Sequence, residues 1–386
     1  MNILFLGTHG QYNIGDELLL ETFLSNLGPD NHYTVNSYDP PFTRDMLSGR
    51  FNLQTFHTTR QLPFFLRCLL TSDLLFFGGG SIIKELYASV GRNPYATLRM
   101  ILATVTFAKR VTGKTVIMSN VGVGPIATPG GERLARAILK QVDFISVRDQ
   151  RSFELCQKLG LQPQRLRRVP DAVFANAPAA LLAETPAQPP ERQPGEPLRL
   201  ALNLNYDIEN RAAWEGFLNG LAGALQRLQA NQPLELHALP MQSRFKANDD
   251  LSVLQGFQER IPGIPMTLHS PETAQQAAAI IAGCDAVLAE RLHTLVIAAI
   301  LGRPFYGLVY DVKVAELVDY LGMGEHSLNI NRPFETEALY LGLCGMLQQR
   351  QLLAGQLLQR STALRSELTA YFDQLRAEYL HPTQQR

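Results

Sequence analysis

Residues 285–302 read DAVLAERLHTLVIAAILG, and this stretch decides the fold. Its first apolar run is typical of a buried strand, and the apolar segment that ends at Gly302 is typical of a buried helix. The polar residues Glu290, Arg291 and His293 lie between the two. A strand that passes directly into a helix is the repeating unit of a parallel α/β sheet.

The same alternation of apolar runs and amphipathic segments continues along the chain in both directions. The apolar runs predict buried strands of parallel sheets, and the segments between them predict helices. Helical material at 335–380 predicts a C-terminal helical tail. The predicted strands are 2–6, 73–77, 115–121, 143–147, 168–173, 198–204, 234–239, 265–268, 285–288 and 304–310.

A proline-rich stretch separates the two runs of alternating elements. Six prolines fall within 178–197, and such a stretch cannot hold a regular helix or strand throughout. We therefore predict an N-terminal domain at 1–177, a linker at 178–197 and a C-terminal domain at 198–386. Each domain is expected to be doubly wound and Rossmann-like, and the two to face each other across a cleft in a GT-B-like arrangement.

Charge and cysteine usage exclude several classes of protein. The 35 Lys and Arg residues balance the 35 Asp and Glu residues, so nucleic acid is not an expected partner. The four cysteines form no CxxC pair, which disfavours a structural metal site or a disulfide framework. The first residues show no secretory pattern, so a cytoplasmic location is expected.

A glycine-rich loop follows the first predicted strand. Gly7, Gly10 and Gly15 allow a ligand to approach the backbone closely, but their spacing does not match the dinucleotide-binding pattern GxGxxG. Asn13 and Asp16 precede the next helix. They either cap it or, in the case of Asp16, supply a catalytic carboxylate.

Two further loops follow predicted strands of the first half. Gly79 and Gly80 belong to a run of three glycines, which either admits a ligand or merely needs positive φ. Arg148 is placed to hold a carboxylate or phosphate, or else forms a surface ion pair. Asp149 and Ser152, which come next, are predicted to cap the following helix.

Arg291, His293 and Lys313 are the corresponding candidates in the second half. Arg291 and His293 open a buried helix, whose N-terminal partial charge favours an anion, although a lone histidine is more often structural. Lys313 opens the next helix, where the dipole disfavours a cation unless an anion is near. We expect Arg148 to join these cations around one anion, with Asp16 as a second acid–base group.

Eight short motifs, taken in their order along the chain, resemble those of the polysaccharide pyruvyl transferase family. Two positions depart from the family pattern: Glu290, where a small or apolar residue is usual, and Val312, where proline is common. Both flank the site without removing a charged group. The matching motifs are GQYNIGDE at 10–17, GGG at 78–80, GVGP at 122–125, SVRDQRS at 146–152, PDA at 170–172, RLH at 291–293, GRP at 302–304 and YDVK at 310–313.

The resemblance implies transfer of a pyruvyl group from phosphoenolpyruvate to a sugar. The product is a cyclic ketal on a cell-surface glycan, an exopolysaccharide or a lipid-linked precursor, and phosphate is released. Phosphoenolpyruvate is the co-substrate, and no cofactor or metal is implied. The first domain is then the acceptor side and the second the phosphoenolpyruvate side.

The resemblance also implies a role for each candidate residue. His293 acts as general acid–base, Arg291 and Lys313 hold the departing phosphate, Arg148 holds the carboxylate, and Asp16 activates the sugar hydroxyl. The remaining candidates line the substrate site: Asn13, Gly15, Gly79 and Gly80.

Two other functions fit the same architecture. One is a sugar-nucleotide glycosyltransferase of GT-B fold, and the other is a non-catalytic glycan-binding relative, against which the clustered charge argues. The apolar stretch 62–70 serves either core packing, the favoured interpretation, or peripheral contact with the inner face of a membrane. An oligomer is left open.

Overall fold

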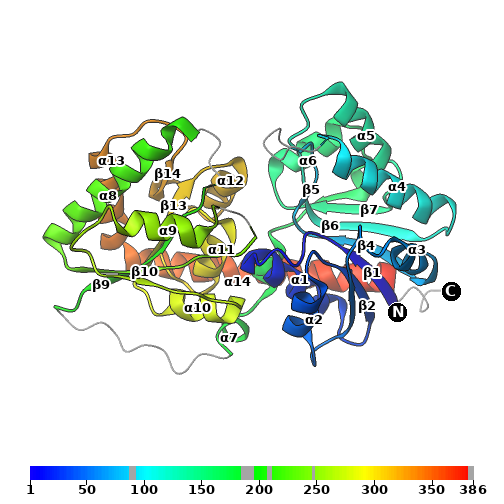
Figure 1. The fold of residues 1–386 in the computed structure, drawn as a ribbon, viewed down its shortest axis with the longest axis horizontal. Helices are drawn as coiled ribbons and strands as arrows, with labels where there is room; N and C mark the ends of the chain where they lie inside the picture. The colour runs from blue at the N-terminus through cyan, green and yellow to red at the C-terminus, as the bar shows by residue number, and fades with distance from the viewer. Residues whose placement is uncertain (87–92, 184–194, 207–210, 246–247, 381–386) are drawn as a thin grey trace. The chain divides into compact units, whose positions relative to one another are not determined.

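The computed structural model describes residues 1–86, 93–183, 195–206, 211–245 and 248–380 (Figure 1). The chain divides into two compact units, and each contains one parallel sheet. The first unit comprises Met1–Gln11, Asp16–Ala175 and Ser366–Arg386, and the second comprises Tyr12–Gly15 and Asn176–Arg365.

This division differs from the predicted domains at two places. Residues 12–15 group with the second unit, and residues 366–386 group with the first. The predicted linker begins with a short helix, α7 (Pro178–Leu181), and its residues 184–194 lie outside the described part of the chain.

The first unit is built on an eight-stranded parallel sheet. Its strand order is β3-β2-β1-β4-β6-β7-β8, and β5 pairs with β6. One helical layer, α3 to α5, packs on one face, where the buried side chains form a single apolar cluster. The strands are β1 (Asn2–Leu6), β2 (His32–Asn36), β3 (Asn52–Phe56), β4 (Leu74–Gly78), β5 (Ser81–Ile83), β6 (Thr115–Val123), β7 (Phe144–Val147) and β8 (Leu166–Arg168).

Helix α1 and the end of the C-terminal helix α14 also belong to the first unit. The ring of Phe23 on α1 contacts those of Phe5 on β1 and Phe372 on α14, with centroids 5.7 and 5.8 Å away. The C-terminal segment therefore completes the first unit's core. Helices with residues in this unit are α1 (Ile14–Leu27), α2 (Pro40–Leu47), α3 (Leu62–Thr71), α4 (Ala96–Arg110), α5 (Pro129–Leu139), α6 (Gln150–Lys158) and α14 (Arg350–Leu375).

The second unit contains a six-stranded parallel sheet in the order β11-β10-β9-β12-β13-β14. Its strands are β9 (Leu198–Asn203), β10 (Leu234–Ala238), β11 (Met266–Leu268), β12 (Ala286–Ala289), β13 (Phe305–Val309) and β14 (Ser327–Asn329). Its helices besides α7 are α8 (Trp214–Asn231), α9 (Asp250–Gln258), α10 (Ala274–Ala282), α11 (Leu292–Ile300), α12 (Val312–Tyr320) and α13 (Thr336–Gln348).

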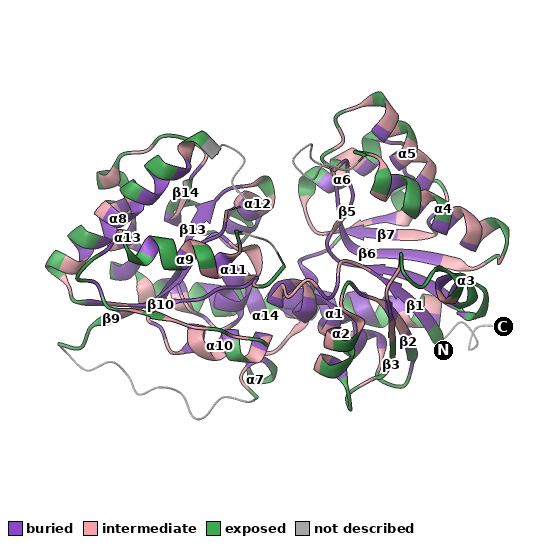
Figure 2. Cartoon of the chain, in the orientation of Figure 1, coloured by how far each residue is buried: buried purple, intermediate pink, exposed green. Residues whose placement is uncertain are grey.

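Burial explains why the predicted strands and helices form where they do (Figure 2). All residues of β4, β12 and β13 are buried, which is typical of central parallel strands covered by helices on both faces. Helix α11 is buried from Thr294 to Ile300, as the all-apolar segment predicts.

One predicted strand, 168–173, is wrong. Strand β8 ends at Arg168, and a buried 3₁₀ turn follows at Ala172–Ala175. Pro170 has no N–H for a sheet ladder. Asp171 accepts a hydrogen bond from the backbone N–H of Val173 at 3.1 Å, which stabilises a turn in place of a strand.

Among the helices of the described residues, none combines the length and the apolar character that crossing a bilayer requires.

Two glycines with the same φ of 65° allow a test of how packing restricts the turn after β4. A Cβ at Gly79 would lie 2.0 Å from Leu19 Cδ2, whereas nothing lies within 4 Å of one at Gly113. Gly113→Ala should cost about 1 kcal/mol in backbone strain alone. Gly79→Ala should cost about 2–4 kcal/mol because overpacking is added.

Urea unfolding of both variants, followed by circular dichroism, measures this difference. Equal losses of unfolding free energy in the two variants would show that Leu19 moves away from the new Cβ without an energetic cost.

Candidate active site

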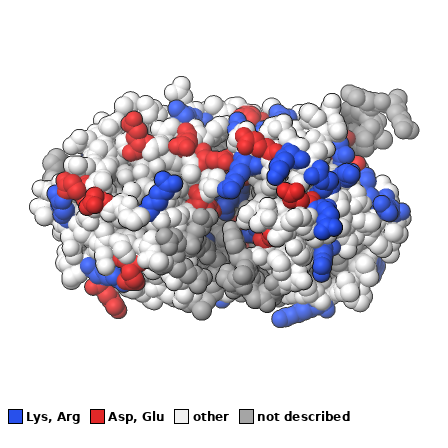
Figure 3. Space-filling model, turned by 90° about the horizontal axis from the view of Figure 1, so that it is seen from above, with Lys and Arg blue, Asp and Glu red and all other residues white. Residues whose placement is uncertain are grey.

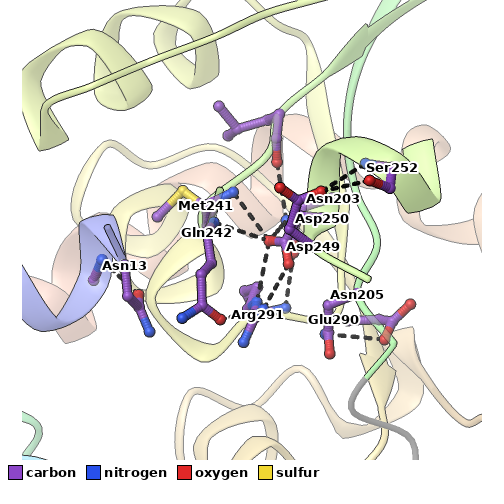
Figure 4. Close-up of polar contacts among 12 residues, drawn as sticks. Asn13, Asn203, Asn205, Met241, Gln242, Asp249, Asp250, Ser252, Glu290 and Arg291 are labelled. Carbon is purple, nitrogen blue, oxygen red and sulfur yellow. Dashed lines mark hydrogen bonds and ion pairs between the residues drawn. The ribbon is translucent and has the colours of Figure 1, made fainter. Parts of the chain in front are cut away.

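A buried polar cluster lies at the carboxyl ends of the central strands of the second unit (Figure 4). Asp250, the first residue of α9, is at its centre and is only 1% exposed. Its Oδ2 accepts hydrogen bonds from the backbone N–H groups of Met241 at 3.0 Å and Gln242 at 3.2 Å. Asp250 therefore fixes the loop that follows β10.

Arg291 is the cation of this cluster. Its Nη2 lies 2.5 Å from Asp250 Oδ1, and its Nε donates to Asp250 Oδ2 at 3.1 Å. Nη2 also donates to Gln242 Oε1 at 3.1 Å. The backbone N–H of Arg291 donates to Asn203 Oδ1 at 2.9 Å. The guanidinium is thus held in one orientation, with a carboxylate beside it.

Glu290 adds a second buried carboxylate next to Arg291. The residue is fully buried, and its Oε2 accepts a hydrogen bond from Asn205 Nδ2 at 3.0 Å (Figure 4). This contact gives a structural reason for glutamate at a position where a small or apolar residue is usual.

His293 lies directly against Gly15. A Cβ on Gly15 would lie 2.1 Å from His293 Nδ1, so only glycine leaves room for the imidazole ring. The side-chain oxygen of Asn13 accepts the N–H of Gly15 at 3.1 Å, and Asn13 forms an antiparallel bridge with Gln242. Four predicted residues, Asn13, Gly15, Arg291 and His293, therefore come together within the second unit.

Lys313 lies after β13, the strand that pairs with β12. Its Nζ is 3.0 Å from Asp311 Oδ2, and the lysine side chain is 38% exposed. Asp311 also caps α12 by accepting the N–H of Val314 at 3.0 Å. Asp311 is therefore the anion that offsets the unfavourable interaction of Lys313 with the dipole of α12.

In the first unit, Arg148 forms a buried ion pair with Asp171. The distance is 2.8 Å, and the two side chains are 8% and 5% exposed. Burial disfavours the charged form of Arg148, but Asp171 and then Asp149 outweigh it and raise the pKa of Arg148. The predicted cap is confirmed, because Asp149 accepts the N–H of Ser152 at 2.7 Å at the start of α6.

Asp16 belongs to the first unit, in the first turn of α1. It is partly buried, and its charge contributes to raising the pKa of both Arg148 and Glu17. The structure therefore places Asp16 in the same electrostatic environment as Arg148.

Gly79 and Gly80 form the turn from β4 to β5, and both have positive φ. The N–H of Gly79 donates to Ser119 O at 2.9 Å, and Gly80 O accepts the N–H of Gly122 at 2.8 Å. These backbone groups serve the sheet, so the turn accounts for the glycines. A ligand contact at Gly79 or Gly80 stays a prediction.

Two buried titratable residues near β1 were missed in the sequence. Glu17 is 4% exposed and accepts the N–H of Gly10 at 2.6 Å. Burial raises the pKa of Glu17 to about 8 and lowers the pKa of His9 to about 3. Gly7 and Gly10 predicted a loop at this place, but the sequence pattern does not indicate how deeply the side chains of Glu17 and His9 are buried.

Asp250, Gln242 and Asn203 were also missed. Asn203 and Asn205 alternate with leucine at the end of an apolar strand, which was an available signal. Asp249 and Asp250 form a doublet in which Asp249 is the helix cap, and nothing in the sequence distinguishes the buried partner of Arg291.

Within the described residues, no group of three or more His, Cys, Asp or Glu side chains is placed to hold a metal ion.

Two parallel sheets with alternating helices, a polar cluster at the strand ends and a helical C-terminal tail define an α/β protein of GT-B fold. The family model of polysaccharide pyruvyl transferase matches residues 13–312. The chain belongs to this family, whose members are transferases of polysaccharide biosynthesis. No curated protein matches the chain.

Solved structures share the fold at low sequence identity. HepE of Anabaena in complex with UDP is 14% identical, with a TM-score of 0.61, and the match covers 99% of this chain and 100% of HepE. A putative UDP-N-acetylglucosamine 2-epimerase from Listeria monocytogenes is 10% identical, with a TM-score of 0.63 and coverage of 100% and 98%. Sucrose-phosphate synthase from Thermosynechococcus elongatus is 11% identical, with a TM-score of 0.60 and coverage of 99% and 100%.

Removing the charge of Asp250 should destabilise the second unit strongly, because this buried carboxylate binds both Nε and Nη2 of the Arg291 guanidinium. Asp250→Asn is expected to cost about 3–5 kcal/mol. The double variant Asp250→Asn with Arg291→Gln should recover part of this loss. Urea unfolding, followed by the fluorescence of the single tryptophan, Trp214, measures both.

The neighbouring Asp249 provides the control. Asp249→Asn removes a negative charge but keeps a residue that can cap α9, so it should cost well under 1 kcal/mol. A loss equal to that of Asp250→Asn would contradict the assignment of Asp250 as the partner that Arg291 requires.

Glu17 should make the first unit less stable as pH rises. Its folded pKa of about 8 exceeds the ordinary value of 4.5, so its contribution is complete below pH 4.5 and is lost as pH rises through about 8. His9 acts in the opposite direction, and its contribution is lost as pH falls from 6.5 towards 3.

Above pH 6.5, Glu17 is the main contributor of these two groups to the change of unfolding free energy with pH. The free energy of unfolding should fall by about 1 kcal/mol between pH 6.5 and 8, and Glu17→Gln should remove this fall. Hydrogen exchange in β1 as a function of pH measures it, with the exposed Glu259→Gln as control. An unchanged slope in Glu17→Gln would assign the effect to another group.

Proposed function

We propose that this protein transfers a pyruvyl group from phosphoenolpyruvate to a sugar and forms a cyclic ketal with release of phosphate. Family membership supports the class of reaction. The observation that carries the proposal is the packing of His293 against Gly15 at the start of α11, beside the fixed guanidinium of Arg291.

The reaction needs proton movement and charge stabilisation but no electron transfer. One sugar hydroxyl adds to C2 of phosphoenolpyruvate, and C3 gains a proton to become a methyl group. The second hydroxyl then bonds to C2 as the bond from C2 to the phosphate oxygen breaks. Of the two hydroxyl protons, one is balanced by the methyl group and the other leaves with phosphate.

His293 is the proposed general acid–base in these steps. An imidazole has an unperturbed pKa near neutrality, which suits it to both donating and accepting a proton. Gly15 packs against one side of the ring, and we propose that this contact positions the imidazole before substrate binds. Fixed orientation matters because a proton is transferred only across hydrogen-bond distance.

Arg291 and Lys313 are the proposed phosphate contacts. They follow the adjacent strands β12 and β13, and Arg291 lies at the N-terminus of a nine-residue buried helix. Each has a carboxylate partner, so we propose that they act by directed hydrogen bonds and not by a large local positive charge.

Asp16 and Arg148 are the proposed contributions of the first unit. Asp16 is the candidate base for the sugar hydroxyl, and Arg148 is the candidate contact for the carboxylate of phosphoenolpyruvate. The ion pair with Asp171 gives Arg148 a fixed position. The acceptor is proposed to be a sugar of a surface glycan or its lipid-linked precursor, modified in the cytoplasm.

Phosphate release with phosphoenolpyruvate and a panel of mannosaminyl, galactosyl and lipid-linked acceptors tests this function. His293→Ala should lower kcat by about a hundredfold or more while the fold is kept. His269→Ala, which removes a partly buried histidine elsewhere in the same unit, should leave kcat within about twofold. Arg291 is tested in the Asp250→Asn/Arg291→Gln pair, because Arg291→Ala alone leaves a buried carboxylate unpaired.

Three outcomes would overturn the proposal. Near-wild-type turnover of His293→Ala removes the proposed acid–base group. Thermal stabilisation by UDP-sugars but not by phosphoenolpyruvate favours a glycosyltransferase. Absence of phosphate release across the whole panel favours a non-catalytic glycan-binding protein.

A further inference from the structure

Helix α3 exposes a row of leucines where a surface helix normally presents polar side chains. Leu62, Leu66 and Leu70 are 54%, 41% and 57% exposed. Their spacing of four residues places them along one side of the helix. The side of the helix that adjoins this row packs on the core, where Phe65, Cys68 and Leu69 are buried. Core packing therefore explains the buried side chains of α3 but not its exposed leucines.

Helix α4 extends the same outward surface. Buried residues of α3 and α4 belong to one apolar cluster, so the two helices pack side by side on one face of the sheet (Figure 1). On the outer side of α4, Met100 is 46% exposed and Arg99 lies next to it. We call Leu62, Leu66, Leu70, Arg67, Arg99 and Met100 the Leu–Arg face.

The charge of these helices is of one sign. Helices α3 and α4 contain four basic residues, Arg67, Arg99, Lys109 and Arg110, and no acidic residue. Residues 99–168 as a whole contain 13 Lys and Arg against 4 Asp and Glu, in a chain whose formal net charge is zero. Figure 3 shows Lys and Arg side chains gathered over the part of the molecule to which α4 and α5 belong. This surface complements a negative partner.

A basic cavity lies at the carboxyl end of α4. Its volume is about 470 Å³, and four of its six lining residues are cations. The end of α3 contacts the segment that follows α4, because Lys114 Nζ donates to Leu69 O at 2.5 Å. The cavity itself lies on the α5 side of α4, where Gln141 Nε2 donates to Thr106 Oγ1 at 3.1 Å, and Lys109 within it is paired with Asp143 at 2.8 Å. The lining residues are Lys109, Arg110, Lys140, Gln141, Asp143 and Arg165.

We propose that the Leu–Arg face is a peripheral docking surface for an anionic lipid bilayer. Leucine side chains enter the boundary between headgroups and acyl chains, and arginines contact the lipid phosphates around them. The cavity at the end of α4 accepts a phosphate headgroup. This surface belongs to the first unit alone, and the proposal does not depend on which reaction the protein catalyses.

The mixture of apolar and basic side chains on the Leu–Arg face favours a bilayer over a protein partner. A protein interface depletes charge at its centre, whereas here the exposed Arg67 lies beside the leucine row. A membrane accommodates both, since the leucine tips are buried while the guanidinium stays at headgroup depth. Each basic residue near an anionic surface strengthens binding by about fivefold, so several together give measurable attachment.

Flotation of the full chain with vesicles tests the proposal. The wild type should bind vesicles made of phosphatidylcholine and phosphatidylglycerol in equal parts, and added salt should weaken the binding. It should not bind phosphatidylcholine alone. Leu62→Gln/Leu66→Gln/Leu70→Gln should lower the partition coefficient by about tenfold or more. Arg67→Gln/Arg99→Gln should lower it by about 25-fold and reduce its salt dependence.

Matched controls come from the second unit and from α2. Leu341 and Leu352 are 57% and 60% exposed, so Leu341→Gln/Leu352→Gln removes similar apolar surface elsewhere. Arg44→Gln removes an exposed arginine on α2. Both controls should bind vesicles like the wild type, and circular dichroism confirms that each variant is folded.

Three results overturn the proposal: no wild-type binding to the anionic vesicles, unchanged binding of the triple leucine variant, or equal loss in the leucine controls. A concentration-dependent dimer in solution that the triple leucine variant abolishes would assign the face to self-association.

Discussion

The second unit depends on the ion pair between Asp250 and Arg291. Asp250 binds the loop after β10, and Arg291 immediately precedes α11 after β12, so one pair joins two loops and two helix starts. Asn203 at the end of β9 contacts both partners. Because β9 lies between β10 and β12, the cluster ties together three adjacent strand ends. The orientation of Arg291, and the start of the helix that carries His293, follow from this arrangement.

The first unit also has a buried cation paired with a buried carboxylate at the ends of its strands. Its sheet also ends in loops where a buried cation meets a buried carboxylate, in this case Arg148 and Asp171. A desolvated guanidinium is tolerated only with such a partner. In both units the parallel sheet supplies the position, because its strand ends gather loops at one edge, and the ion pair supplies the rigidity.

The sequence predicted the central parts of both sheets because fully buried strands read as uninterrupted apolar runs. Strands β2 and β3 were missed because half-exposed segments such as NLQTF carry no such run. Residues 168–173 were misassigned because Asp171 forms a turn that apolar content cannot indicate. Candidate cations could be found from their places after strands. Their carboxylate partners could not, because Asp250 and Arg291 are 41 positions apart in the sequence and meet only in the folded chain.

Pairing of each candidate cation with a carboxylate also bears on how a substrate arrives. Arg148, Arg291 and Lys313 each have an aspartate within 3.0 Å, so each pair has little net charge when seen from a distance. Fields from such dipoles fall off faster than the field of a lone cation. An anionic ligand that approaches these pairs gains little electrostatic acceleration, and its association rate should change little with ionic strength.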